Sequence, residues 1–302
     1  MSELLVGTSS GLFAATGAGL EPDAGFGPRG VTALSADGAA AWAIAERRTL
    51  ARRESDGSWT DIARSADLDL DCVLRTEADV LVGTDEAHLL RLEANALARV
   101  EAFESVPGRD QWYTPWGGPP AVRSLAADLA GRLHANVHVG GIPRSHDGER
   151  WEPTIDIDAD VHQVIAHPSD PDVVLAAGAV GLCVSVDGGA TWRTEREGLH
   201  SSYARAVAVA GDSVLISACT GPHGGRAALY RTTLETGAAL DKCTDGLPDW
   251  FDGNIDSGWV AASGEVVAFG TPDGEVYRSD DGGIRWERLA EGLTTIRALS
   301  FV

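Results

Sequence analysis

Three histidines and one aspartate in the second half of the chain have the side chains best suited to chemistry. His138, His162 and His200 each lie beside a short apolar segment, and Asp256 precedes another such segment. Imidazole transfers protons near neutral pH, and a carboxylate can assist it. His162, His200 and Asp256 are therefore candidate catalytic residues. Alternatively, His138, His162 and His200 are the ligands of one divalent metal ion, Zn, Mn or Fe. A third interpretation is that each histidine is an ordinary core or rim residue bonded to a backbone carbonyl.

Three arginines form a second group. Arg123, Arg205 and Arg297 occupy the same second position in three copies of a recurring apolar segment. Guanidinium groups bind carboxylate or phosphate through paired hydrogen bonds, so this group predicts a small anionic ligand. The alternative is that these arginines bond carbonyl or carboxylate groups of neighbouring repeats. The other four copies are not basic at this position and have Thr32, Cys72, Gln163 and Ser257.

Two loops, 110–116 and 250–256, contain more aromatic residues than ordinary surface loops do. They fall in the two longest intervals between repeats, and loops longer than a connection requires are often functional. Their rings could stack on a sugar or another planar ligand, or could pack the loops themselves. The candidate ligand-binding residues, besides the arginines, are Tyr113, Trp116, Trp250 and His223.

The elements that would position these residues are short strands in a repeated pattern. An apolar strand is followed in most copies by a second strand that ends in glycine. The first strands start 40 to 52 residues apart, at 31–37, 71–77, 122–128, 162–168, 204–210, 256–262 and 296–302. Four-stranded repeats near 40 residues are typical of β-propellers. Residues before each first strand and after each second strand would then converge at one mouth of the central channel, where ligands usually bind.

The two ends of the chain complete each other. Segment 4–15 has a second strand with no first strand before it, and segment 296–302 is a first strand with nothing after it. Pairing them in one blade would close the ring and remove exposed sheet edges. We therefore expect an all-β, seven-bladed β-propeller, with 1–302 as one domain. The expected blades are about 296–302 plus 3–25, 30–63, 70–103, 122–155, 161–199, 203–247 and 255–293. Segment 89–103, the best candidate helix, should instead form two strands.

Three repeats contain a sharper motif between their third and fourth strands. The sequences SVDGGATW (185–192) and SDDGGIRW (279–286) fit Ser-x-Asp-x-Gly-x-Thr-Trp, with Arg for Thr in the second; 145–151 is one residue short, and 54–59 is degenerate. The motif resembles the BNR or Asp-box repeat of sialidase-like and YCF48-like propellers. This resemblance implies a fold-stabilising turn at the blade periphery, where the Asp accepts backbone N–H bonds. Sialidase activity is not expected, because seven blades are expected instead of that enzyme's six, no Arg-Ile-Pro motif stands near the N-terminus, and no Tyr–Glu pair can be recognised.

Composition excludes several classes of partner. The chain has 302 residues and a formal net charge of −21, with 45 acidic and 24 basic residues. An acidic surface repels nucleic acid and anionic lipid, so neither is an expected partner. No apolar run reaches the roughly 20 residues of a membrane helix, and the first residues lack the basic region of a secretory signal. The four cysteines are widely spaced, so we expect a reducing cytoplasmic location.

Two functions remain open from the sequence. The first is a cytoplasmic enzyme, of hydrolase or lyase type, that acts on a small polar or anionic molecule with or without the assistance of a metal. Its pocket would combine the histidines, Asp256, the arginines and the aromatic walls. The second is a non-catalytic propeller for ligand binding or protein assembly, resembling the Asp-box assembly factors of photosynthetic complexes. That class would use a broad outer surface.

Overall fold

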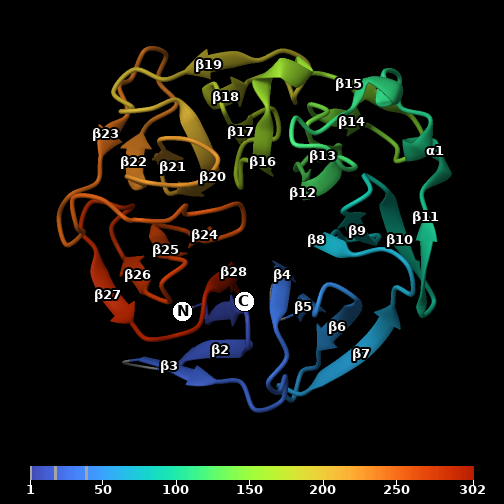
Figure 1. Ribbon diagram of the computed structural model, residues 1–302, viewed down its shortest axis with the longest axis horizontal. Coiled ribbons are helices and arrows are strands. Elements are labelled where there is room, and N and C mark those ends of the chain that lie inside the picture. The colour runs from blue at the N-terminus through green and yellow to red at the C-terminus, as the bar shows by residue number, and fades with distance from the viewer. Residues whose placement is uncertain (1, 17–18, 38–39) are drawn as a thin grey trace.

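The computed structural model describes residues 2–16, 19–37 and 40–302. Seven antiparallel four-stranded sheets are arranged as blades around one central channel (Figure 1). The innermost strands of neighbouring blades contact one another all the way around this channel. The expectation of an all-β, seven-bladed propeller is confirmed.

The strands, from the channel outwards, have the following bounds. Blade one consists of β28 (Ile296–Phe301), β1 (Leu4–Thr8), β2 (Gly11–Thr16) and β3 (Gly19–Pro22). Blade two consists of β4 (Val31–Asp37), β5 (Ala40–Ala45), β6 (Thr49–Arg53) and β7 (Trp59–Arg64). Blade three consists of β8 (Leu70–Arg75), β9 (Val80–Thr84), β10 (Leu89–Glu93) and β11 (Ala96–Arg99). Blade four consists of β12 (Ala121–Ala127), β13 (Leu133–His138), β14 (Pro143–Ser145) and β15 (Trp151–Pro153).

The remaining three blades follow the same order. Blade five consists of β16 (Val161–Ala166), β17 (Val174–Gly178), β18 (Gly181–Ser185) and β19 (Arg193–Glu195). Blade six consists of β20 (Tyr203–Ala210), β21 (Ser213–Cys219), β22 (Ala228–Thr232) and β23 (Asp241–Lys242). Blade seven consists of β24 (Val260–Ser263), β25 (Val266–Gly270), β26 (Val276–Ser279) and β27 (Glu287–Ala290). The described helices are the short α1 (Glu101–Glu104), η1 (Arg109–Gln111) and η2 (Ile157–Ala159), and none of them is long and apolar enough to cross a membrane.

The ring closes through the two ends of the chain, as the repeat pattern predicted. β28 pairs antiparallel with β1, so that Val6 faces Leu299. The backbones of Glu3 and Val302 then exchange two hydrogen bonds, of 3.0 and 2.8 Å between nitrogen and oxygen. Both strands are buried in the cluster of Leu4, Val6, Ile296 and Leu299. The C-terminal strand is therefore the inner edge of the first blade.

Glycine at the end of a second strand lets the next blade approach closely. A Cβ atom on Gly7 would lie 2.5 Å from Cγ1 of Val31, and one on Gly270 would lie 2.3 Å from Cγ2 of Ile296. Both distances are shorter than carbon atoms tolerate, so neither position accepts a side chain without moving the neighbouring strand. This packing explains why the second strands of the repeat end in glycine.

The innermost strands share one irregularity. In blades one to six the strand register slips by one residue near the cavity end, leaving two residues opposite one on the second strand. Such a β-bulge places one residue outside the ladder and redirects its side chain. The bulge residues are Arg297, Thr32, Asp71, Arg123, His162 and Arg205. The sequence alignment is therefore one residue out in blades three and five, where it placed Cys72 and Gln163 at this position.

The Ser-x-Asp turns form dense local hydrogen-bond networks. The Asp187 carboxylate accepts bonds from the Ala190 and Thr191 amides at 3.0 and 2.9 Å and from the Thr191 hydroxyl at 2.6 Å. The Thr191 hydroxyl contributes most to lowering the pKa of Asp187, to about 2. Asp281 accepts equivalent bonds from the amides of Ile284 and Arg285. The turns connect third and fourth strands, so their aspartates serve the fold.

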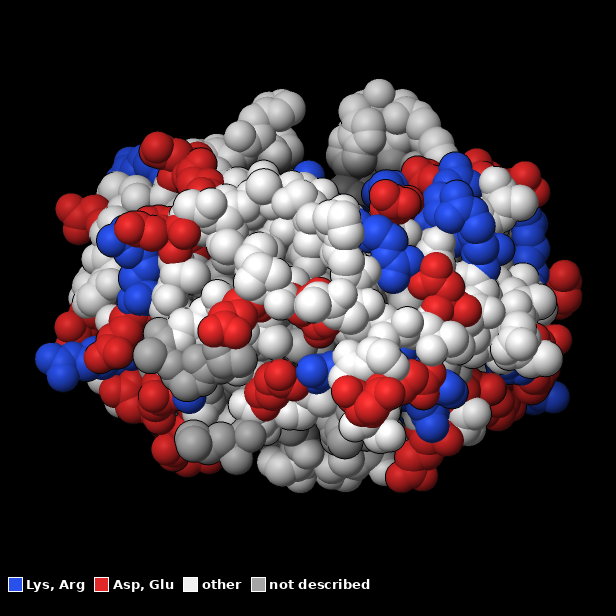
Figure 2. All heavy atoms as spheres, turned by 90° about the horizontal axis from the view of Figure 1, so that it is seen from below, with Lys and Arg blue, Asp and Glu red and all other residues white. Residues whose placement is uncertain are grey.

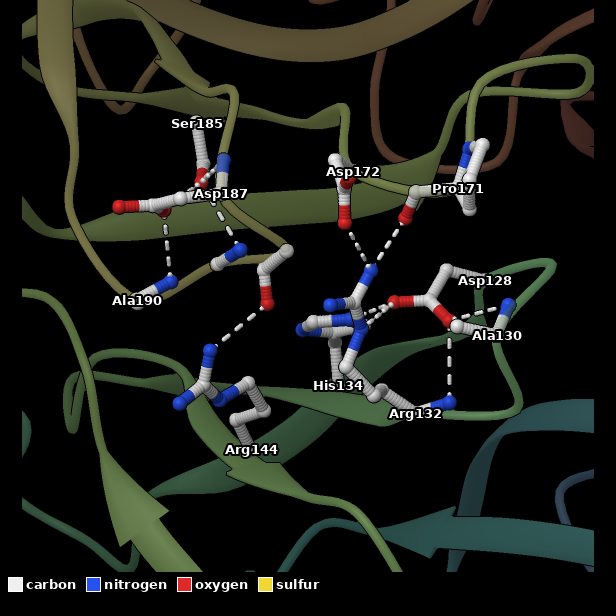
Figure 3. Close-up of polar contacts among 12 residues, drawn as sticks. Asp128, Ala130, Arg132, His134, Arg144, Pro171, Asp172, Ser185, Asp187 and Ala190 are labelled. Atoms are coloured by element: carbon white, nitrogen blue, oxygen red, sulfur yellow. Dashed lines mark hydrogen bonds and ion pairs between the residues drawn. The ribbon is translucent and has the colours of Figure 1, made fainter.

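A polar network joins blades four and five (Figure 3). It extends from the turn between β12 and β13 and from β14 to the segments before β17 and after β18. Arg132 contacts the buried carboxylate of Asp128 at 2.6 Å and reaches the carboxylate of Asp172 in the next blade at 3.0 Å. Arg144 donates to the Gly188 carbonyl, inside the Ser-x-Asp turn of blade five, at 3.0 Å. His134, which is fully buried, lies 3.2 Å from Asp128 and packs against the same turn. These residues clamp neighbouring blades together.

Acidic and basic side chains are interspersed on the outer surface. In the side view of Figure 2, acidic side chains are the more widespread, basic side chains lie between them in smaller groups, and uncharged residues cover much of the upper centre. This distribution matches the formal net charge of −21.

Candidate functional site

A cavity of about 970 Å³ opens at the end of the channel where the innermost strands begin. Five of the six bulge residues line it: Thr32, Asp71, Arg123, Arg205 and Arg297. In five of the blades, the bulge therefore directs one side chain into a shared space. Other lining side chains are Glu46, Arg47, Asp85, Trp116, His138, Tyr203, His223, Asp256 and Trp259.

Asp256 orders two of the arginines. Its carboxylate oxygens lie 3.4 Å from Nη2 of Arg123 and 2.8 Å from Nη2 of Arg205, and the Ser257 amide donates to it at 2.8 Å. Burial alone would raise the pKa of Asp256, but Arg123 and Arg205 overcome this effect and hold the pKa at about 2. Asp256 therefore stays ionised at neutral pH. It lies in the cavity, as the sequence indicated, with the chemistry of an arginine partner rather than of a proton carrier.

Arg297 differs from the other two arginines. Its side chain is exposed to the cavity, and within the described part of the chain it has neither an ion pair nor a hydrogen bond. Of the four described arginines that line the cavity, Arg297 is the one without a carboxylate partner. Its five N–H donors are available to an incoming anion.

Acidic residues around Arg47 form the part of the cavity wall that belongs to blades two and three. Arg47 lies 3.0 Å from Asp71 and 3.7 Å from Asp85 through Nη2, and 2.9 Å from Asp69 through Nε. Burial of the Asp71 carboxyl, only 15% of whose side chain is exposed, raises its pKa to about 6 despite the nearby Arg47. From the sequence, Asp69 and Asp71 are among the few polar groups expected at the channel mouth in blades one to three, but neither was selected as a site residue, and Arg47 was not identified.

A second cluster lies at the cavity edge between blades four and five. His138 ends β13, Asp160 follows η2, and His162 is the bulge residue of β16. Their three ligand atoms lie within 4.8 Å of one another, with His138 Nε2 3.0 Å and His162 Nε2 3.7 Å from the Asp160 carboxylate. The two imidazoles are part of a ladder of rings, with Trp116 beside His138 at 5.2 Å and Tyr203 beside His162 at 4.8 Å between centroids.

Both histidines of this cluster are neutral at pH 7. Burial is the main cause that lowers the pKa of His138, and burial together with Arg205 lowers that of His162 to about 3. Nδ1 of His162 lies 2.6 Å from the Ala204 carbonyl, so Nδ1 carries the proton and Nε2 presents a lone pair. An imidazole that cannot be protonated near neutrality is poorly matched to the general acid–base role predicted for His162.

Local backbone geometry explains how these residues meet. His134, Asn136 and His138 alternate along β13, so they share one face, as the period of two in the sequence predicted. Asp160 immediately precedes β16 in a left-handed conformation with a φ of 45°, and its carboxylate comes within 3.7 Å of His162 Nε2. Asp160 was not selected from the sequence, and its position two residues before a bulge histidine is the signal that could have identified it.

His200 lies outside this cluster. Its Nδ1 is 2.7 Å from the Tyr230 hydroxyl, and its ring is 4.7 Å from that of Trp250. Trp250 is also covered by Lys242, whose Nζ lies 3.5 Å from a ring centroid, and by Arg226 at 4.3 Å. His200 and Trp250 thus belong to an aromatic and cationic cluster of blade six and do not line the cavity. Tyr203, three residues after His200, lines it instead.

The remaining candidates are divided between the cavity and the outer surface. Trp116, with 63% of its surface exposed, and His223 line the cavity. Tyr113 is 46% exposed but does not line it, and its backbone pairs with Val139.

The fold, but not the sequence, connects this chain with known proteins. No model of a known protein family matches the sequence, and no functionally curated protein matches it either. A solved structure of YCF48 bound to D1 peptide is similar, with a TM-score of 0.59 and 16% identity over 97% of this chain and 89% of that one. The WD40 β-propeller domain of Doa1 is similar with a TM-score of 0.64 and 12% identity, over 96% of this chain and 88% of that one.

A glycoside hydrolase of family GH74 from Niastella koreensis is also similar, with a TM-score of 0.60 and 14% identity over 94% of this chain and 46% of that one. At identities this low, the structural similarity establishes a shared propeller architecture and leaves the activity of the chain to its own residues.

Proposed function

We propose that the protein binds a small molecule bearing a carboxylate or phosphate group in the cavity at the channel mouth. The observation that carries this proposal is the guanidinium of Arg297, which is exposed, has no partner among the described residues, and lines the same cavity as the Arg123–Asp256–Arg205 group. Trp116 provides a flat apolar wall on which a sugar or other ring can stack. The volume of about 970 Å³ lies within the range of small-molecule sites.

We further propose that this site supports hydrolysis or elimination. Asp71 supports this step, because its carboxyl lines the cavity and its raised pKa of about 6 lets it accept and donate a proton near neutrality. His223 also lines the cavity and is exposed. Asp71 therefore takes the place that His162 and His200 had in the sequence interpretation. The four cysteines are free and buried, which suits a reducing cytoplasm.

Peptide binding is the second candidate function. One of the similar structures is YCF48 in complex with D1 peptide, and the exposed Trp116 at the cavity edge offers a contact for a peptide side chain. A peptide carboxylate would use the same arginines, so the two candidates differ in what surrounds the anion.

Titration calorimetry tests the anion site. The probes are glucuronate and glucose 6-phosphate, with glucose as the uncharged comparison. We expect the charged sugars to bind and glucose not to bind. Arg297→Gln should weaken binding about tenfold or more, because a hydrogen bond to a charged group contributes about 1.5–3 kcal/mol.

Arg285→Gln is the matched control, because Arg285 is an exposed arginine in a peripheral turn. Equal affinity of glucose and the charged sugars, or equal loss in both arginine variants, would contradict the proposal. Incubation with 4-nitrophenyl glucuronide, with and without Asp71→Asn, then tests for turnover. If only peptides with a free carboxyl terminus bind, the second candidate is correct.

A further inference from the structure

The buried polar atoms of His138, Asp160 and His162 are not satisfied by one another. His138 Nε2, Asp160 Oδ1 and His162 Nε2 are each shielded from solvent and have no hydrogen-bond partner in the described structure. His138 Nε2 and Asp160 Oδ1 are 3.0 Å apart but are not aligned as a hydrogen bond. Because buried polar groups are nearly always paired, three orphaned atoms that face one space indicate a missing partner.

The ring orientation of His162 sets the nature of that partner. Its Nδ1 proton is held by the Ala204 carbonyl, so Nε2 and the two Asp160 oxygens are all acceptors. A direct His138–Asp160 ion pair would leave the fully buried His162 Nε2 without a donor, at a cost of about 1–3 kcal/mol. A cation placed between the three residues satisfies them together. Backbone carbonyls commonly hold the second nitrogen of metal-binding histidines in this way.

We propose that His138, Asp160 and His162 bind one divalent transition-metal ion of the zinc, manganese or iron type. Two imidazoles and one carboxylate are borderline donors that suit these metals and leave further coordination positions open. His138 also lines the cavity, so a metal held by this cluster would lie beside the proposed anion site. Asp160 takes the place that the sequence gave to His200.

The two arginines beside the cluster oppose a bound cation and would draw an anion to it. Nη1 of Arg123 lies 3.5 Å from His138 Nδ1, and the charge of Arg205 also acts on His162. Asp256 neutralises one of these two charges. A bound divalent ion therefore leaves a net positive site, which an anion from the cavity would balance. The metal proposal rests on the cluster itself, and it stands even if that anion proves to be different.

Metal analysis of the purified, full-length chain tests this inference directly. The protein is stripped with chelator, dialysed against limiting Zn²⁺ or Co²⁺, and analysed for bound metal and for the visible absorption of Co²⁺. We expect one ion per chain. His138→Ala and the isosteric Asp160→Asn should each weaken binding by at least about tenfold, since even outer-shell changes cost that much. His162 is left unchanged. It is completely buried, so a substitution there would disturb folding as well as metal binding.

His200→Ala is the matched control, because it removes an exposed histidine outside the cluster. It should retain one ion per chain and an unchanged Co²⁺ spectrum. Absence of binding in the wild type would overturn the inference, and so would normal binding by Asp160→Asn or equal loss in His200→Ala. Thermal unfolding without metal confirms that each variant is folded. A wild type that binds no metal but binds glucuronate through Arg297 would refute the metal site alone and leave the proposed function intact.

Discussion

The charged residues of the cavity differ in how completely they are compensated. Asp256 lies between two arginines, and Arg47 lies among three aspartates, so these groups mainly hold one another in place. Arg297 has no such partner in the described chain, and Asp71 is buried strongly enough to titrate near neutral pH. The groups with unused capacity are therefore the ones from which ligand binding and proton transfer are expected.

Asp71 should make its own contribution to stability depend on pH. Its pKa is about 6 in the folded protein, compared with a usual value of 3.8. Burial raises this pKa most, and Asp85 and Asp69 add to the rise, whereas Arg47 and Arg123 lower it. Between these values the folded chain holds more protons than the unfolded chain, so this contribution falls as pH rises. Asp71→Asn should be more stable than the wild type by about 1–3 kcal/mol at pH 7 and about equal to it at pH 4.

Urea unfolding at both pH values measures this difference. Asp187→Asn provides a control whose stability relative to the wild type should change little between these pH values, because the lowered pKa of Asp187, about 2, places its pH dependence below about pH 4. A stability difference between Asp71→Asn and wild type that is the same at pH 4 and pH 7 would show that Asp71 does not titrate as described.

At the scale of the strand, the β-bulge joins the repeat to the site. Each bulge residue follows a buried apolar residue, which is Val31, Leu70, Val122, Val161, Ala204 or Ile296. The sequence alignment began one residue late in blades three and five and so missed Asp71 and His162 as equivalent positions. A bulge inserts a residue without a mark in the apolar pattern, and the buried residue before it is the better guide.

The Ser-x-Asp turns give a test of the element on its own. Asp187→Ala removes bonds to two backbone amides and to the hydroxyl of Thr191, and it should cost about 1–2 kcal/mol. Differential scanning calorimetry should show a Tm lowered by about 2–6 °C. Asp280→Ala is the control, because exposed Asp280 bonds only to Arg278 among the described residues. Equal effects of the two substitutions would argue against a stabilising turn.

Much of the architecture could be predicted from the sequence, and less of the site. Strand repeats and the incomplete first and last units carry the blade number and the closure, because apolar periodicity is local. Within segment 89–103, residues 89–99 do form β10 and β11, which turn at Ala94 with a positive φ of 54°, whereas residues 101–103 belong to the short α1. His200 was misplaced because the path of the loop before β20 depends on contacts with Tyr230 and Trp250, which no local pattern records.

The whole molecule depends on the pairing of β28 with β1. Deletion of residues 296–302 would remove buried Ile296, Ala298 and Leu299 and expose the edges of β1 and of the neighbouring inner strands. The loss should be comparable with the whole stability of a domain, about 5–15 kcal/mol, so we expect no cooperative thermal transition and formation of aggregates.

Circular dichroism and size-exclusion chromatography monitor this outcome. Deletion of Val302 alone is the control and should lower stability by about 1 kcal/mol, the typical net value of one or two terminal hydrogen bonds. A synthetic peptide of residues 296–302 should restore folding of the shortened chain. A monomeric shortened chain that melts within a few degrees of the wild type would show that closure contributes little.

Closure by β28 also decides what an attachment to the protein would obstruct. Ile296 begins this strand at the cavity end. At the other end of the strand, Phe301 lies among the residues around the opposite opening of the channel, and the backbone of Val302 pairs with that of Glu3. Ser2 and Val302, the described ends of the chain, therefore lie at the end of the inner strands that is farther from the cavity. A bead, dye or fused protein joined to either terminus would hold the molecule from behind, and the ligand opening would stay accessible to the surrounding solution.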